Sequence, residues 1–107
     1  MKKIILLVLL SHFSFSQITQ IGSDIDGEAA FDVSGYAISL SSDGTIVAIG
    51  AYGNDGSAKD AGHVRVYDWD SSNSSWIQRG NDIDGEAADD NSGRSVSLSS
   101  DGSTVAI

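Results

Sequence analysis

The sequence predicts an all-β protein built from repeated units, each a four-stranded antiparallel sheet of the kind that forms one blade of a β-propeller. Three observations predict this fold class. A long stretch of the sequence occurs twice at a fixed offset of 58 residues. Short runs of alternating apolar and polar residues are separated by turns rich in Gly, Ser, Asp and Asn. No segment after residue 17 keeps the periodicity of an amphipathic helix.

Residues 1–16 have the pattern of a signal peptide rather than of a folded element. Two lysines precede an uninterrupted apolar run at residues 4–10, and small polar residues follow. Ser14 and Ser16 then occupy the −3 and −1 positions of a cleavage site between Ser16 and Gln17. The run is far shorter than the roughly 20 residues that span a bilayer, so we expect no transmembrane anchor here. The alternative is a buried N-terminal strand or helix. We expect an exported protein, secreted or held at the outer cell surface.

The internal repeat is the strongest signal in the remaining sequence. GSDIDGEAA at residues 22–30 returns as GNDIDGEAA at residues 80–88. Between residues 18–49 and 76–107, 21 of 32 positions are identical. A period of this length indicates a propeller, a solenoid or another array in which each repeat is one supersecondary unit.

The repeat divides residues 17–107 into a first repeat, 18–75, and a partial second repeat, 76–107, or about 1.5 blades. A blade buries its faces only against its neighbours, and propellers close with roughly four to eight blades. We therefore expect further repeats, or self-association of several copies, to complete the fold. Residues 18–22 match the fourth-strand sequence at 76–80, which favours an outer strand that closes a ring.

Within one repeat, the pattern predicts four short strands. The first alternates apolar and polar residues, and the second is apolar on both faces, as expected for a central strand covered on two sides. A Ser-Ser-Asp-Gly turn separates them, a loop rich in Gly, Asn and Asp follows the second, and a polar turn follows the third. The predicted strands are residues 34–40, 45–51, 63–69 and 76–79.

Three motifs of the first repeat resemble those of a known family of repeats. They are Ser34-Gly35, Gly50-Ala51-Tyr52 and the run Gly62–Tyr67, and they resemble the FG-GAP repeat of integrin-α-type β-propellers. The DIDGEAA segment and the SLSSDG turn resemble the secreted, Bacteroidota-like variant of that repeat. In that family a Phe-Gly pair opens the unit, Gly-Ala-Pro closes its second strand, and a Gly-x-Val-x-Val-aromatic strand follows. The resemblance covers residues 18–107. It implies a non-catalytic propeller that supports adhesion or binding to proteins or glycans.

The sequence departs from that family in its calcium loop. The family places several Asp or Asn residues between the first and second strands, whereas this chain has SSDG at residues 41–44 and again at 99–102. Calcium takes six to eight oxygen ligands, which the lone carboxylate of Asp43 or Asp101 cannot supply. We therefore expect the family's calcium site to be lost here. The proline of Gly-Ala-Pro is also replaced, by Tyr52.

A different group of carboxylates is a candidate calcium site. Asp residues at alternate positions followed by Gly are typical of the start of a calcium loop, although no Glu stands at the twelfth position. The alternative is a pair of solvated loops between blades, in which Asp side chains cap turns. The candidate metal ligands are Asp24, Asp26, Glu28, Asp82, Asp84 and Glu86.

Other side chains have a structural and a functional interpretation. His63 is the single histidine after the signal peptide, and we interpret it as a strand residue because the sequence shows no Cys, second His or Ser arranged to orient it. Tyr67, Trp69 and Trp76 could form a platform on which a sugar ring stacks, but packing between blades is the simpler interpretation.

The net charge and the absence of cysteine exclude several classes of function. The net charge of −9 argues against binding to nucleic acids or anionic membranes, and the absence of Cys excludes disulfides and Cys-based zinc sites. The sequence shows no nucleophile–base pair, so we expect no enzymatic activity in this chain. The favoured function is an exported module for extracellular or cell-surface binding or adhesion. The alternative is the N-terminal binding module of a secreted polysaccharide-acting enzyme.

Overall fold

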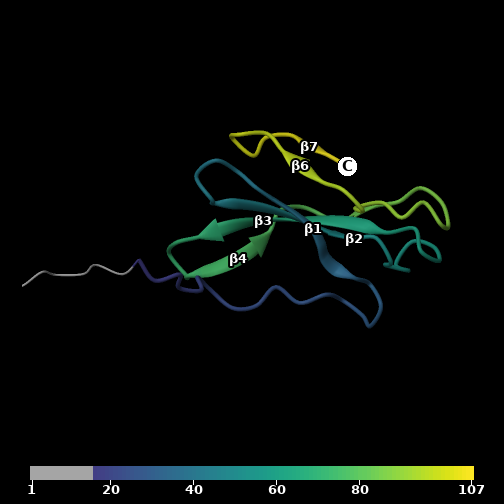
Figure 1. The fold of residues 1–107 in the computed structure, drawn as a ribbon, viewed down its shortest axis with the longest axis horizontal. Coiled ribbons are helices and arrows are strands. Elements are labelled where there is room, and N and C mark those ends of the chain that lie inside the picture. The colour runs from purple at the N-terminus through teal and green to yellow at the C-terminus, as the bar shows by residue number, and fades with distance from the viewer. Residues whose placement is uncertain (1–15) are drawn as a thin grey trace, which may run out of the picture.

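The computed structural model describes residues 16–107, and every regular element among them is a β-strand. The main sheet is an antiparallel meander of β1 (Ser34–Leu40), β2 (Ile46–Ala51), β3 (His63–Asp70) and β4 (Ser75–Gln78), in that order across the sheet (Figure 1). The prediction of an all-β, antiparallel fold is confirmed. These four strands begin and end within one residue of the predicted bounds.

The turn between β1 and β2 is organised by one carboxylate. Asp43 Oδ1 accepts hydrogen bonds from the Thr45 backbone N–H (3.0 Å), the Thr45 hydroxyl (2.8 Å) and the Ser41 hydroxyl (2.8 Å). The Ser41 hydroxyl oxygen in turn accepts from the backbone N–H of Ile46. These bonds hold the pKa of Asp43 below its usual value, and the bond from the Thr45 N–H contributes most to the shift. The turn between β1 and β2 is thus held by hydrogen bonds to the carboxylate of Asp43.

The second repeat reproduces the same turn. Asp101 Oδ1 accepts from the Ser103 hydroxyl (2.7 Å), the Ser103 N–H (2.9 Å) and the Ser99 hydroxyl (2.9 Å). The bonds from Ser103 are the main reason why the pKa of Asp101 is lowered to about 2. The turn joins β6 (Ser97–Leu98) to β7 (Val105–Ala106), which form a separate two-stranded antiparallel sheet.

One further strand comes from a segment predicted as a loop. β5 (Ile83–Asp84) pairs antiparallel with the beginning of β3, where His63 lies opposite Asp84 and Val64 opposite Ile83. β4 pairs with the other half of β3, from Tyr67 to Asp70. The acidic segment of the second repeat is therefore bound to the sheet of the first.

The core lies between the two repeats. One face of the main sheet presents Ile46, Ala48, Val64 and Val66, and Val96, Leu98 and Val105 of the second repeat pack against it. Figure 1 shows the β6–β7 hairpin lying over the main sheet. The Leu98 backbone N–H also donates to the Ser39 hydroxyl (2.9 Å). Apolar burial between the two repeats thus contributes to the stability of the fold.

Backbone atoms of the two repeats come into direct contact along this junction. Gly62 and Ser92 form a parallel β-bridge. A Cβ atom at Gly50 would overlap the carbonyl of Gly93, and one at Gly85 would overlap the carbonyl of Ala61. Gly50 belongs to the Gly-Ala-Tyr motif, and Gly93 is the second-repeat counterpart of Gly35. The glycines of two sequence motifs therefore meet across the junction, where no side chain fits.

The opposite face of the main sheet is partly covered by the residues that precede β1. Arg65 Nη2 donates to the Asp26 carbonyl oxygen (2.8 Å), and Trp76 Nε1 donates to the Ile21 carbonyl oxygen (3.3 Å). Trp69 and Trp76 pack edge to face, with ring centroids 5.2 Å apart, and lie against Gly22. This pair packs within one sheet, with Trp69 on β3 and Trp76 on β4, against the segment that precedes β1. Residues 18–22 form no strand here.

A strip of apolar side chains on the same face remains exposed. It consists of Tyr36, Ile38 and Leu40 of β1 (the β1 strip), of which Ile38 is 63% and Leu40 56% exposed.

The predicted signal peptide lies outside the described residues, except for Ser16. Within residues 16–107, no helix is long and apolar enough to cross a membrane.

Candidate functional site

His63 opens β3 and is buried, with 1% of its surface exposed. Side chains alternate along a strand, so His63, Arg65 and Tyr67 point to the same face of the sheet. That face is the one crossed by the segment before β1. Because Ala51 of β2 lies opposite His63 on one side and Asp84 of β5 on the other, the imidazole is held inside the sheet rather than at its edge.

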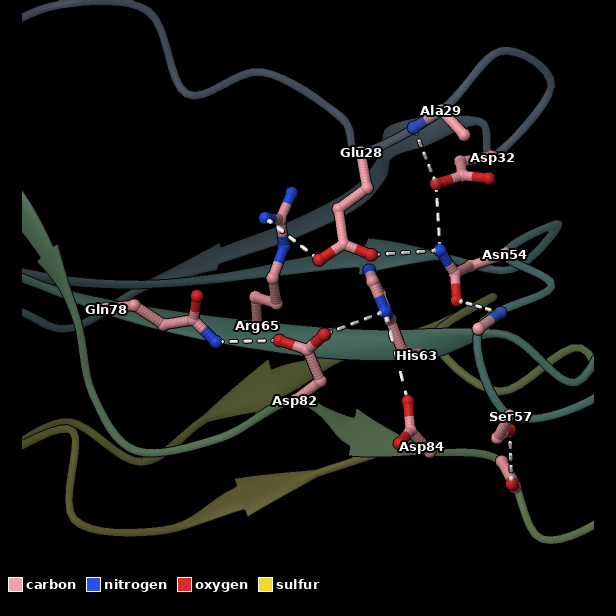
Figure 2. A network of polar contacts seen from close by, with 12 residues as sticks. Glu28, Ala29, Asp32, Asn54, Ser57, His63, Arg65, Gln78, Asp82 and Asp84 are labelled. Carbon is pink, nitrogen blue, oxygen red and sulfur yellow. Dashed lines mark hydrogen bonds and ion pairs between the residues drawn. The ribbon is translucent and has the colours of Figure 1, made fainter.

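Three carboxylates surround the imidazole of His63. Its Nδ1 atom lies 3.6 Å from Asp82 Oδ2 and 4.0 Å from Asp84 Oδ1. Ligand atoms of Glu28, His63 and Asp82 all lie within 4.8 Å of one another. Figure 2 shows these carboxylates pointing toward the ring from two sides, Glu28 from the segment before β1 and the two aspartates from the segment after β4. We call Glu28, His63, Asp82 and Asp84 the His63 cluster.

His63 Nδ1 has no hydrogen-bond partner, although it is completely buried. The two aspartate oxygens are too far away, since a hydrogen bond from an imidazole nitrogen to oxygen spans about 2.7–3.2 Å. Leaving such a group unpaired costs about 1–3 kcal/mol. A proton shared after a small side-chain movement, or a bound cation, would satisfy the nitrogen.

Neighbouring polar side chains fix the carboxylates in place. Gln78 Nε2 donates to Asp82 Oδ1 (2.7 Å), which leaves Oδ2 facing the imidazole. Asn54 Nδ2 lies 3.4 Å from Glu28 Oε2, and Arg65 Nη1 lies 3.7 Å from Glu28 Oε1 (Figure 2). Both Glu28 and Asp82 are therefore held by a second residue, as is common around ligand-binding carboxylates.

A buried Asx turn supports Glu28 from behind. Asn54 Nδ2 donates to Asp32 Oδ2 (2.8 Å), and the same carboxylate oxygen accepts from the Ala29 backbone N–H (3.1 Å). Asn54 Oδ1 accepts from the Gly56 N–H (2.8 Å). The loop after β2 and the acidic segment before β1 are thus connected through buried polar groups.

The local electrostatics also affect Tyr67, two residues beyond Arg65 on the same face. Burial raises the pKa of Tyr67, Arg65 lowers it, and the negative charges of Asp82 and Glu28 raise it further. The Arg65 guanidinium lies 5.7 Å from the centre of the Tyr67 ring. Three carboxylates and one guanidinium give this side of the sheet a net negative charge.

The structure divides the six predicted metal ligands into two groups. Glu28, Asp82 and Asp84 meet at His63. The remaining three do not join them. Asp24 accepts a hydrogen bond from Gln20 Nε2 (2.9 Å) and, with Asp26, Tyr67 and Trp76, lines a shallow hollow, and Glu86 is exposed.

The cluster is shared between the two repeats. Glu28 and His63 belong to the first repeat, and Asp82 and Asp84 belong to the second. At the offset of 58 residues, Asp82 corresponds to Asp24 and Asp84 to Asp26, while Glu28 corresponds to Glu86. At this junction the first repeat thus contributes the Glu and the His, and the second contributes the two aspartates.

Sequence reasoning found the carboxylates but not the residue on which they converge. The partners of His63 lie 19 and 21 residues after it and 35 residues before it. The alternation of His63, Arg65 and Tyr67 along one predicted strand indicates that their side chains share a face. This alternation was the one signal in the sequence that pointed to His63 as part of a polar site. The pairing of β5 with β3, which brings the aspartates to His63, leaves no local signature.

Comparison of the chain with protein-family models, with curated proteins and with solved structures gave no match.

Proposed function

We propose that this chain is an exported, non-catalytic repeat module of a β-propeller, akin to the FG-GAP repeats that its motifs resemble, and that it binds a protein or glycan outside the cell. The observation that carries the proposal is the packing of the second repeat on the first. Val96 and Leu98 pack against the first repeat and are partly buried there, whereas their counterparts Ile38 and Leu40 are exposed.

The occupant that fits the β1 strip is another copy of the same repeat. Val96 and Leu98 are the residues equivalent to Ile38 and Leu40, and they pack against Ile46, Ala48, Val64 and Val66. A preceding repeat would present the same kind of surface to the β1 strip. Consecutive sheets that stack in this way, face to face, are the arrangement of propeller blades.

Main-chain bonds support the same arrangement. The N–H groups of Asp89, Asn91 and Ser92 donate to the carbonyls of residues 59–61 of the first repeat, at 2.8–3.0 Å. The first-repeat counterparts of these three are Phe31, Val33 and Ser34. Phe31 is exposed, as is the β1 strip, and we infer that together they form the edge on which a preceding repeat would dock, which we call the docking edge.

Self-association of the purified chain tests the docking edge. We expect analytical ultracentrifugation to show concentration-dependent association that the double substitution Ile38→Asp and Leu40→Asp abolishes. Ile77→Asp is the matched control, because Ile77 is also exposed but lies on β4, outside the strip. A wild-type chain that stays monomeric, or equal association by all three proteins, would contradict the proposal.

Export is tested separately through the N-terminal segment. Residues 1–20 fused to a periplasmic reporter enzyme are expected to deliver active reporter outside the cytoplasm, and N-terminal sequencing is expected to find cleavage between Ser16 and Gln17. Replacing Leu6 and Leu7 of the apolar run with Asp is expected to abolish delivery. Reporter activity confined to the cytoplasm would contradict the export proposal.

A further inference from the structure

We propose that the His63 cluster binds a divalent transition-metal ion of the zinc class, with His63 Nδ1 and the carboxylates of Glu28 and Asp82 as ligands and Asp84 beside them. The site would connect two consecutive repeats. It shares Glu28, Asp82 and Asp84 with the calcium site expected from the sequence, but it adds His63 as a ligand and takes a different metal. It does not depend on the proposed binding function.

The buried and unpaired nitrogen of His63 is the first support for a metal. A histidine buried for structural reasons alone donates or accepts a hydrogen bond through its ring nitrogens, because an unsatisfied buried polar group destabilises the fold. Here Nδ1 is fully buried, lacks a hydrogen-bond partner and faces two carboxylate oxygens. A cation between these atoms would use the nitrogen lone pair and both negative charges.

The distances from His63 to the two aspartates are close to those of a tetrahedral shell around a small ion, and the ligand atom of Glu28 lies within 4.8 Å of those of His63 and Asp82. Zinc lies about 2.0–2.2 Å from its nitrogen and oxygen ligands, so two tetrahedral ligands are separated by about 3.4 Å. The Nδ1–Oδ2 distance from His63 to Asp82 is 3.6 Å, and that from His63 Nδ1 to Asp84 Oδ1 is 4.0 Å. Movements of a few tenths of an ångström would bring these atoms to an ion.

The nature of the ligands favours a transition metal over calcium. Imidazole nitrogen is a preferred ligand of zinc and of neighbouring first-row metals. Calcium takes six to eight oxygen ligands, whereas a nitrogen points into the middle of this cluster. The cluster contains three carboxylates, and Arg65 is the one guanidinium beside them. The remaining negative charge would balance the charge of a dication.

The surrounding residues already orient the proposed ligands. Gln78 holds one oxygen of Asp82 and leaves the other facing His63. Asn54 and Arg65 hold Glu28 from two sides. Such outer contacts typically change metal affinity by about 10–100-fold when they are removed, so Gln78→Ala is expected to weaken binding while it leaves all ligands in place.

The repeated sequence provides matched controls for the test. Glu28→Gln and Glu86→Gln remove the same charge from equivalent positions, as do Asp82→Asn and Asp24→Asn, but only the first of each pair lies in the cluster. Equilibrium dialysis with Zn²⁺ and visible absorption of Co²⁺ measure binding to the full chain. Circular dichroism confirms that each variant is folded.

We expect one Zn²⁺ per chain and a Co²⁺ spectrum typical of low coordination number. Glu28→Gln and Asp82→Asn are expected to weaken binding by roughly 100-fold, as loss of a ligand weakens it at least as much as loss of an outer contact. Glu86→Gln and Asp24→Asn should leave binding within about twofold of the wild type, in line with the central magnitudes for surface changes. His63→Gln should abolish the Co²⁺ spectrum.

Three results would overturn the proposal. The wild-type chain could fail to bind Zn²⁺ at millimolar concentration, in which case His63 pairs with its carboxylates through a proton alone. All four carboxylate variants could lose affinity equally, which would indicate diffuse attraction to an acidic surface. Calcium could bind more tightly than Zn²⁺ and be insensitive to His63→Gln, which would support an oxygen-only site.

Discussion

Val33 has a backbone φ of 57°, in the left-handed region that β-branched residues rarely adopt. Its counterpart in the second repeat, Asn91, has a φ of 51°. Asn tolerates this conformation, and Asn91 Nδ2 also donates to the Asp60 carbonyl (3.1 Å). The two copies thus fold alike at this position, but only the second carries a residue suited to it.

Replacing Val33 with Asn is therefore expected to stabilise the protein by about 1 kcal/mol, because a β-branched residue is strained in this region whereas Asn tolerates it. Chemical denaturation measures the change. The reverse substitution, Asn91→Val, is the matched comparison and should destabilise by more than that, because it also removes the bond to Asp60. Equal and opposite effects would mean that the hydrogen bond contributes nothing.

Asp101 predicts how one turn responds to acid. Its pKa of about 2 in the folded protein lies below the value of 3.8 in an unstructured chain, because Ser103 and Ser99 hydrogen-bond to the ionised form. A lowered pKa stabilises the fold at pH values above the unfolded pKa, and that contribution is lost as the pH falls from about 4 toward 2. A carboxyl titration followed by NMR should give a midpoint near 2. Asp101→Asn, which accepts hydrogen bonds but does not titrate, should lose this part of the acid sensitivity.

At the scale of elements, the strands of the first repeat were predictable because their signals are local. Alternation marks β1, double-sided apolarity marks β2, and Ser-Ser-Asp-Gly marks the turn between them. β5 was missed because Ile83 and Asp84 lie in a Gly- and Asp-rich segment, and their strand exists only through pairing with His63 and Val64 about 20 residues earlier. The same pairing builds the His63 cluster. Three of the six candidate metal ligands, Glu28, Asp82 and Asp84, therefore lie together at His63, a grouping that the sequence did not predict.

The junction between repeats makes Gly50 a sensitive position. In an ordinary strand, Gly→Ala is neutral or stabilising by about 0.4–1 kcal/mol because it restricts the unfolded chain. At Gly50 the added Cβ would overlap the backbone of Gly93, which cannot move aside as a side chain does. We expect Gly50→Ala to destabilise by about 2–3 kcal/mol, at the upper end for overpacking.

Gly35→Ala is the control for that substitution. Gly35 has open space around its Cα, so only its positive φ of 84° opposes a side chain. Its cost should be about 1 kcal/mol. Hydrogen exchange at Leu98 and Val105 should accelerate in Gly50→Ala but not in Gly35→Ala, because only Gly50 contacts the second repeat. Equal acceleration in both variants would show that the contact with Gly93 is not the cause.

At the scale of the whole molecule, the two repeats contact one another through different surfaces. The first repeat contributes Ile46, Ala48, Val64 and Val66, and the second contributes Val96, Leu98 and Val105. The His63 cluster follows the same division, with its histidine from one repeat and its aspartates from the next. Packing and polar contacts are thus both directional, from one repeat to its successor.

This direction has a geometric consequence. A contact between two unlike surfaces is heterologous, so each added unit presents the surface that receives the next one. Such growth stops only when the rotation per unit returns the last surface to the first, and otherwise it continues as a filament. If a further copy docks on the exposed Ile38 and Leu40, as we propose, these residues become either the seam at which a ring is sealed or the growing end of a polymer. A small change in the angle between repeats would be enough to convert one into the other.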